Sequence, residues 1–234
     1  MELRDVLETT AACRDFAGDP VPDELLERIL DTARFAPSGG NRQGWRVIVI
    51  KDPVLRRQLR DLAMLGWREY VAYLDHGLVP FSPDDAGVWQ KPPFDLAAAR
   101  ATERPDPFVD ALAELPVMLV VVDMRALAVT DAELPRHSIV GGGSIYPFVH
   151  NILLAARDVG LGGVMTTYLC RQETAARRLL ALPQAFAIAS LVALGVPAHP
   201  VRRLRRRPSA QFTTVDRFDG PPLTDPSTPT ARAP

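Results

Sequence analysis

A polar segment at residues 36–46 carries the side chains that are best suited to hold a ligand. Ser38, Asn41 and Gln43 stand beside two glycines, between the end of an expected helix and an expected buried strand. A hydroxyl, two amides and accessible backbone N–H groups can bind a flat polar ring or an oxyanion. The alternative is a capped turn, in which these amides satisfy only the neighbouring backbone.

Arginine supplies a second kind of binding group, because the chain has 25 arginines and only two lysines. A GC-rich genome explains most of them, as the excess of alanine and proline indicates. Arginines at two places remain candidates for a binding role. They are Arg14, which Phe16 follows closely, and the run at residues 202–208 (RRLRRRP). For each arginine of this run, the alternative to a binding role is a solvated charge.

The motifs of several enzyme classes are missing. The sequence has no GxxxxGK[ST] phosphate loop and no GxSxG nucleophile turn, and the glycines at 141–143 lack the GxGxxG spacing. The four histidines have no cysteine or carboxylate at metal-ligand spacing, so no metal site is expected. Two cysteines, Cys13 and Cys170, are too few for a disulfide framework.

The segments that must position these groups alternate between strands and helices. Residues 45–51 form an expected buried strand. Residues 115–123 are a β-branched run without alternation, which predicts a central strand covered on both faces. Further strands are expected at 163–168 and 187–195. Strands interleaved with helices predict a single α/β or α+β domain.

Helices are expected at residues 2–10, 23–35, 53–73, 145–159 and 173–182. The segment 145–159 is apolar nearly all round, which predicts burial in a core or at a subunit interface. Ser144 is the expected N-cap of this helix, and Gly160 is expected to end it.

Two segments depart from this alternation. Residues 66–107 are expected to hold an insertion with six prolines and with the aromatic residues Phe81, Trp89 and Phe94, too long for a bare connector. It is either a packed surface insertion or a lid that forms one wall of a pocket. Residues 219–234 hold five prolines and almost no apolar anchors, which predicts a disordered tail after one domain at residues 1–218.

The overall composition limits the possible partners. The chain is 47% hydrophobic and 24% charged, and its net charge of −1 argues against a dedicated nucleic-acid binder. The longest apolar run, at 115–122, is far shorter than the ~18 residues of a membrane span. The charged N-terminus is unlike a signal peptide. No nucleic acid and no membrane are expected as partners, and the expected location is cytoplasmic.

Several of these segments together resemble the nitroreductase family of FMN flavoproteins. The matching text is PSxxNxQxW at 37–45, SIYP at 144–147, NILLAAR at 151–157, GLG at 160–162 and RRRP at 205–208, preceded by Arg14, Phe16 and PV at 20–21. The similarity runs in order from residue 1 to about residue 217. The stretch at 37–45 together with the apolar helix is the specific signal, whereas the arginine run alone is weak.

The resemblance implies an α+β fold with a mainly antiparallel central sheet flanked by helices, in an intertwined homodimer. Two FMN molecules would lie at the interface, each in a site built from both chains. The C-terminal segment would embrace the partner chain.

The resemblance also implies roles for individual residues. Arg14 takes the place of a basic side chain near N1 and the C2 carbonyl of the flavin, where a guanidinium stabilises arriving negative charge. The implied flavin contacts are Pro37, Ser38, Gly39 and Asn41 across the dimer, with Gln43 setting the loop, then Gly163, Met165, Thr166 and Thr167 along the N5 edge, and Arg205 and Arg206 at the phosphate. The family usually has basic residues just before Arg14, where this chain has Thr10, Ala11 and Ala12, so the arginine run would have to compensate.

The activity that the resemblance implies is NAD(P)H-dependent reduction of an electron-poor acceptor, such as a nitroaromatic or a quinone, by a ping-pong hydride mechanism. The flavin carries the chemistry, and no protein group is assigned as a general acid. Two alternatives stay open on the same scaffold. One is a biosynthetic dehydrogenase or flavin-consuming enzyme, and the other, motivated by Ala11, is a non-catalytic flavin-binding protein.

Overall fold

The structure is a computed structural model that describes residues 1–115, 117–199 and 201–223. The chain forms two compact units, Met1–Val201 and Arg202–Pro234, and each is described here by itself. In the second unit, Thr214 pairs with Pro222 in a short turn. The predicted disordered tail falls mostly on residues 224–234, which lie outside the described residues.

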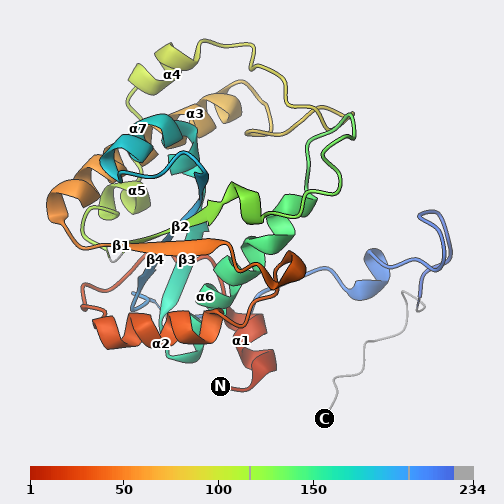
Figure 1. The fold of residues 1–234 in the computed structure, drawn as a ribbon, viewed down its shortest axis with the longest axis horizontal. Coiled ribbons are helices and arrows are strands. Elements are labelled where there is room, and N and C mark those ends of the chain that lie inside the picture. Colours follow the sequence, from red (N-terminus) through yellow and green to blue (C-terminus); the bar gives the residue numbers. More distant parts are fainter. Residues whose placement is uncertain (116, 200, 224–234) are drawn as a thin grey trace. The chain divides into compact units, whose positions relative to one another are not determined.

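Four antiparallel strands form the sheet of the first unit (Figure 1). They are β1 (Trp45–Ile50), β2 (Val117–Asp123), β3 (Gly162–Thr166) and β4 (Phe186–Gly195), in the order β1-β2-β4-β3. All four segments were expected as strands, and β2 does have a strand on either side. The antiparallel pairing confirms the predicted α+β class.

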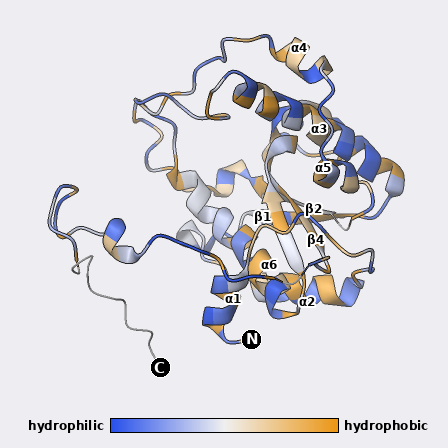
Figure 2. Cartoon of the chain, turned by 180° about the vertical axis from the view of Figure 1, so that it is seen from behind, coloured by the Kyte–Doolittle hydropathy of each residue, from blue (hydrophilic) through white to orange (hydrophobic). Residues whose placement is uncertain are grey.

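Seven α-helices surround the sheet in the described part of the chain. They are α1 (Leu3–Thr9), α2 (Asp23–Ala33), α3 (Pro53–Asp75), α4 (Leu96–Ala101), α5 (Pro107–Ala111), α6 (Tyr146–Asp158) and α7 (Glu173–Leu179). In Figure 1, α1, α2 and α6 lie on one side of the sheet, and α3, α5 and α7 on the other. The first face packs through a parallel stack of Trp45 on Phe148 with ring centroids 4.7 Å apart. The strands and the inner helix faces are apolar, whereas α3 presents a hydrophilic side outward (Figure 2).

Ser144, which lies two residues before α6, makes a hydrogen bond to the polar segment at residues 36–46. Ser144 was expected to be the N-cap of this helix, and this prediction is wrong, because Ile145 occupies the cap and no side chain bonds there. A 3₁₀ turn, η3 (Val140–Ser144), precedes the helix and ends at Ser144. The Ser144 hydroxyl instead accepts a hydrogen bond from the N–H of Gly39 at 3.1 Å. Gly160 follows the helix with φ +88°, the left-handed conformation expected at a helix end.

The insertion after α3 runs from residue 76 to α5 and contains only the short helix α4. Asp95 caps α4 by accepting the N–H of Ala97 at 2.8 Å. Within the described residues, no helix is both long and apolar enough to cross a membrane.

Candidate functional site

The loop between α2 and β1 holds the first group of predicted site residues. Its backbone turns through η1 (Gly39–Asn41), where the Asn41 N–H donates to the Ser38 carbonyl at 2.9 Å. The Gln43 N–H donates to Ser38 Oγ at 2.9 Å, and Gln43 Nε2 donates to Asn41 Oδ1 at 3.1 Å. The amides therefore do satisfy the loop itself, as the capped-turn alternative expects. Pro37, Asn41 and Gln43 nevertheless remain exposed to a ligand.

This loop is strained. Gly40, Asn41 and Gln43 have φ angles of 61°, 52° and 47°, so three of four successive residues are left-handed. Glycine adopts this region freely, but a residue with a Cβ pays roughly 1 kcal/mol or more there. The hydrogen bonds among Ser38, Asn41 and Gln43 hold the backbone in this left-handed conformation. Backbone strain of this kind is concentrated at binding and active sites.

Two glycines let the loop lie close to the segment that follows β2. A Cβ on Gly39 would be 2.8 Å from the Cβ of Ala128. A Cβ on Gly44 would be 2.4 Å from the Cβ of Ala126. Neither distance is tolerated between real side chains, so these glycines are required by packing. Because they lack a Cβ, the loop can pack directly against η2 (Met124–Ala126) and Ala128, which fixes the position of the loop.

Arg14 lies on a segment that extends the sheet beyond β3. Ala12 pairs in parallel with Gly163, and the N–H of Cys13 donates to the Gly163 carbonyl at 3.0 Å. The approach is possible only because β3 begins with glycine, since a Cβ on Gly162 would lie 2.8 Å from Cys13 Sγ. The structure thus brings Arg14 and the predicted residues of β3 to one edge of the sheet.

The Arg14 side chain is exposed and has no carboxylate partner within the described residues. Its charge influences Tyr168, which lies two residues after the end of β3. Burial raises the pKa of Tyr168, and the guanidinium of Arg14 acts in the opposite direction. Arg14 therefore presents a positive charge beside β3 that no carboxylate of the described residues neutralises, which is the charge that an anionic ligand needs.

The predicted N5-edge residues alternate along β3. Gly163 and Thr166 are buried, whereas Met165 is 39% exposed and Thr167 is exposed. Thr166 Oγ1 accepts the N–H of Tyr168 at 3.4 Å. β3 is an edge strand, so the outward side of its second half can face a ligand.

One chain does not bring the two groups of predicted residues together. Trp45, at the end of the polar loop, is in register with Val122 and Ala187, whereas Gly163 pairs with Leu194 at the other end of β4. Three strand spacings are roughly 14 Å, and the run from Ala187 to Leu194 adds roughly 20 Å along the sheet. The loop and the Arg14 edge therefore lie at opposite corners of the sheet.

Arg205 and Arg206 belong to the second unit. Both side chains are exposed, and Arg206 Nη1 donates a hydrogen bond to the Arg205 carbonyl at 3.0 Å. Their assignment to a phosphate stays a prediction.

A buried charged cluster was missed by the sequence analysis. Glu69 on α3 is fully buried and accepts from Arg100 Nε and Arg171 Nε, each at 2.6 Å. Arg100 lies on α4, and Arg171 on η4 (Tyr168–Gln172). The cluster therefore ties the insertion and the segment after β3 to α3. A signal was present, because Glu69 continues the inward spacing of Gly66 and Tyr73 along α3.

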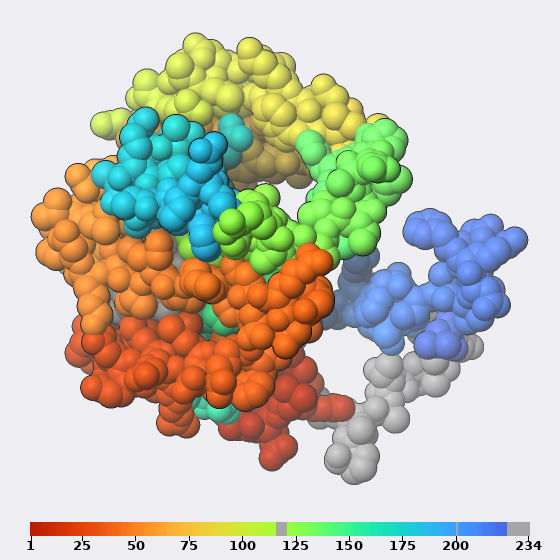
Figure 3. All heavy atoms as spheres, viewed as in Figure 1, coloured from red at the N-terminus to blue at the C-terminus, as the bar shows by residue number. Residues whose placement is uncertain are grey.

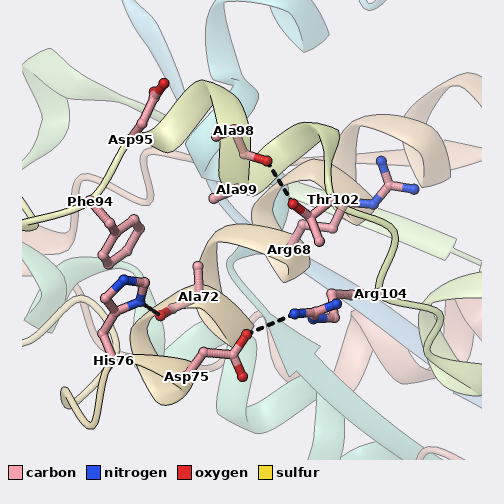
Figure 4. Close-up of a pocket in the computed structure, with 10 residues that line it drawn as sticks. All are labelled: Arg68, Ala72, Asp75, His76, Phe94, Asp95, Ala98, Ala99, Thr102 and Arg104. Atoms are coloured by element: carbon pink, nitrogen blue, oxygen red, sulfur yellow. Dashed lines mark hydrogen bonds and ion pairs between the residues drawn. The ribbon is translucent and has the colours of Figure 1, made fainter.

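A pocket lies between the end of α3 and α4, and Figure 4 shows its lining. Among its charged groups, Asp75 is paired with Arg104 at 3.0 Å and Asp95 caps α4, whereas Arg68 Nε has no hydrogen-bond partner within the described residues. His76 stacks on Phe94 with ring centroids 4.7 Å apart, and its Nδ1 lies 2.8 Å from the Ala72 carbonyl. None of the predicted site residues lines this pocket, which separates it from the candidate site.

Comparison with known proteins yields relatives along most of the chain. A dehydrogenase from Thermus thermophilus named "NADH dehydrogenase" is 31% identical over 194 residues, which are 82% of this chain and 86% of the relative. A BluB-like flavoprotein from Clostridium difficile has a similar structure, with a TM-score of 0.63, 19% identity, and coverage of 92% of this chain and 98% of that one.

An NADPH:FMN oxidoreductase from Vibrio harveyi, solved with NAD⁺, matches with a TM-score of 0.62 and 18% identity over 92% of this chain and 77% of that one. At such low identities, these two structures establish the fold alone. The sequence profile described as "Nitroreductase family" matches residues 7–196. The chain therefore belongs to the nitroreductase family.

Proposed function

We propose that this protein is an FMN-dependent oxidoreductase that takes hydride from NAD(P)H and reduces an electron-poor aromatic or quinone acceptor. The observation that carries the proposal is the strained loop, with its half-buried Ser38 hydroxyl and exposed Asn41 and Gln43 amides, together with Arg14 at the edge of β3, which pairs with no carboxylate of the described residues. The family and the relative named NADH dehydrogenase support an oxidoreductase. The Vibrio harveyi structure supports FMN and NADPH by its name.

The donor set fits a flavin. Ser38, Asn41 and Gln43 offer a hydroxyl and two amides on a rigid backbone, which suit the polar edge of the ring. Arg14 offers a guanidinium that no carboxylate of the described chain neutralises. Met165 and Thr167 expose an edge of backbone and side chain beside it. Arg205 and Arg206 would hold the phosphate, for which paired guanidiniums are suited.

When bound, FMN would supply the hydride-transfer chemistry between the nicotinamide and the acceptor. The chain's own contribution is placement and charge. Arg14 would hold a fixed positive charge against the ring's pyrimidine side, which favours the negative charge that develops there. The left-handed loop keeps its donors in one arrangement before the ligand arrives, so less ordering is left for the binding step.

The proposal includes a homodimer with two sites. The loop and Arg14 lie at opposite corners of one sheet, so they can border a single flavin only when they come from two copies. Ile139, which is 73% exposed, and the exposed Tyr146 offer apolar surface on the segment leading into α6. The proposal assigns residues 1–218 to one FMN-binding domain, with residues 66–107 as a wall over the acceptor.

A second candidate function is favoured by one comparison. The BluB-like flavoprotein is matched over 98% of its length, whereas the Vibrio harveyi oxidoreductase is matched over 77%. A biosynthetic or flavin-consuming reaction with O₂ on this scaffold is therefore the alternative. A flavin-binding protein without catalysis, motivated by Ala11, is the third.

One set of anaerobic measurements separates these functions. The absorption spectrum of freshly purified protein should show bound flavin, and NADH or NADPH should bleach it. Nitroaromatic acceptor should then restore the oxidised spectrum in full. If neither nicotinamide bleaches the flavin, the proposed oxidoreductase is excluded. If O₂ added to the reduced protein destroys the flavin chromophore rather than restoring it, the flavin-consuming alternative holds.

A further inference from the structure

The buried cluster around Glu69 has more positive than negative charges. Glu69 is the acceptor for Arg100 and Arg171, and its Oε1 lies 3.4 Å from Gln172 Nε2. Within the described chain, no second carboxylate pairs with either arginine. Two guanidiniums around one carboxylate leave a net charge of +1, with the carboxylate fully buried and the side chains of Arg100 and Arg171 36% and 30% exposed. Such a charge attracts an anion more strongly than it would on an open surface.

Arg171 is held by one edge only. Its Nε donates to Glu69, while its guanidinium lies 5.2 Å from the ring centroid of Phe81 and 6.0 Å from that of Trp89. Its terminal Nη groups donate no hydrogen bond within the described residues. A guanidinium fixed at Nε and flanked by rings presents its free fork in a defined direction, as carboxylate recognition requires.

Tyr73 adds a second free donor beside Arg171. Its side chain is only 5% exposed, and its hydroxyl donates to no partner within the described residues, although a contact with the Trp89 side chain acts to lower its pKa. A buried hydroxyl without a partner costs folding free energy, so its presence calls for a reason. Phe81 contacts both groups, since its ring centroid lies 5.1 Å from that of Tyr73 and 5.2 Å from the Arg171 guanidinium. Burial raises the pKa of Tyr73, while the charge of Arg171 opposes this.

The aromatic wall is itself anchored from the opposite side. The backbone N–H of Trp89 donates to His137 Nε2 at 2.7 Å, and the backbone N–H of His137 donates to the Gly87 carbonyl at 3.1 Å. The insertion is thereby joined to the segment that follows β2. Figure 3 shows the molecule hollowed between these two parts, the insertion in yellow and the segment after β2 in green.

We propose that Arg171 and Tyr73 form an anion subsite that binds the carboxylate of an aromatic acceptor, with the acceptor's ring against Phe81 and Trp89. This rests on the proposed oxidoreductase function and names its substrate class, an aromatic acid that carries an electron-poor group. η4 follows Thr167 directly, so the subsite lies on the same segment as the predicted flavin edge. Glu69 positions Arg171 and does not touch the substrate.

The test compares 4-nitrobenzoate with uncharged 4-nitrobenzamide. Calorimetric titration of the oxidised holoenzyme without NAD(P)H should give about tenfold tighter binding of the acid, the range of one or two charge-assisted hydrogen bonds. Arg171→Gln should abolish this preference and leave the affinity for the amide unchanged. Arg178→Gln removes the same charge from an exposed position on α7 and should keep the preference.

Tyr73→Phe keeps the ring packing and removes only the unpartnered hydroxyl. It should fold with an unchanged or higher Tm and still lose several-fold affinity for the acid, a combination that a purely structural role does not produce. If Arg171→Gln fails to fold, Tyr73→Phe and Arg171→Lys carry the test. Equal binding of acid and amide by the wild type, or a Tyr73→Phe variant that keeps the full preference, overturns the subsite.

Turnover of 4-nitrobenzamide with NAD(P)H separates the two proposals. If the amide is not reduced, the proposed function fails whatever the acid does. If the amide is reduced and the acid has no binding advantage, only the subsite fails.

Discussion

At the scale of single residues, the site is built from groups whose backbone is unusual. Asn41 and Gln43 are left-handed without being glycine, and both are fixed by hydrogen bonds to Ser38 or to each other. A protein that needed only a turn here could use glycine at lower cost. The side chains of Asn41 and Gln43 therefore have a role that offsets the strain of their backbone, and the proposed flavin contact is that role.

Replacing Gln43 by glycine should separate stability from binding. Gln43→Gly relieves the φ of 47° but removes the bond to Asn41, so the free energy of unfolding should change by less than about 1 kcal/mol. FMN affinity, measured by fluorescence titration, should fall. Ala181→Gly is the matched control, because Ala181 has the same φ of 47° outside the loop. This control should leave FMN affinity unchanged, and equal affinity in both variants would remove Gln43 from the site.

The Cys170 thiol should be unreactive in the folded protein. Burial raises its pKa to about 11, and burial also raises the pKa of Cys13. At pH 8 only about one Cys170 in a thousand is then a thiolate, the reactive form. Ellman's reagent should react slowly with the native protein and with two thiols after unfolding. A fast native reaction that Cys170→Ser abolishes would contradict this.

At the scale of elements, the closest contact near the site joins α3 to η4. A Cβ on Gly66 would lie 2.2 Å from the carbonyl oxygen of Tyr168 and 2.9 Å from its carbonyl carbon. Glycine is therefore required in the middle of a long helix, where it is normally unfavourable. The contact fixes η4, which carries Arg171 and follows the predicted flavin edge.

Gly66→Ala should be destabilising although alanine favours helices. The clash with a backbone carbonyl should outweigh the helix gain of about 1 kcal/mol and lower the free energy of unfolding by about 1–3 kcal/mol. Urea unfolding measures this. Gly18→Ala is the control, because a Cβ on Gly18 meets nothing within 4 Å, and it should have little effect. A stabilised Gly66→Ala would mean that η4 is not held this closely.

Asp131 organises the loop that leads to η3. Its carboxylate accepts from Ser138 Oγ at 2.6 Å, Arg136 Nη1 at 2.8 Å and the Ile139 N–H at 3.0 Å. These bonds, that from Ser138 above all, hold the pKa of Asp131 well below its usual range. A folded pKa below the unfolded value gives stability that is complete above about pH 4 and is lost as the pH falls towards the folded value.

The Asp131→Asn variant should therefore have a lower Tm than the wild type at pH 7, and the difference should narrow as the pH falls below 4. Thermal unfolding at several pH values measures it. Asp85→Asn, an exposed aspartate in the insertion, should follow the wild type throughout. A difference that stays constant down to the lowest pH would show that the carboxylate charge is not what matters.

The sequence was sufficient to predict the class, the four strands and the helices α1, α2, α3, α6 and α7, because their patterns are local, but it did not predict the short helices α4 and α5. The apolar run of β2 predicts its central place in the sheet. The apolar sequence of α6 predicts burial on most sides, whereas within this chain only the face with Phe148, Val149 and Ile152 is buried. What the sequence could not predict are contacts between distant segments. Ser144 had the right type for a cap, but Gly39 lies close enough to take its hydroxyl. The pairing of Ala12 with Gly163 likewise depends on chain tracing that no local pattern contains.

At the scale of the whole molecule, the polar loop and Arg14 lie far apart in one chain, so the proposed flavin site depends on the oligomeric state. A flavin that needs both the polar loop and Arg14 requires two chains, since one sheet holds them at opposite corners. The affinity for FMN and the affinity between chains should then be linked, because a ligand that binds only the dimer stabilises the dimer.

Charging the apolar segment before α6 should test this linkage. Ile139→Glu replaces a side chain that is 73% exposed in one chain, and a carboxylate there should weaken association by disfavouring burial at the interface. Sedimentation should find the wild type at twice the chain mass of 25.7 kDa, and the variant shifted towards one chain with a matching loss of FMN. Val79→Glu, at a side chain 72% exposed in the insertion, is the matched control and should remain dimeric with flavin bound. A monomeric variant that keeps its FMN would mean that one chain completes the site, and the opposite-corner argument would then fail.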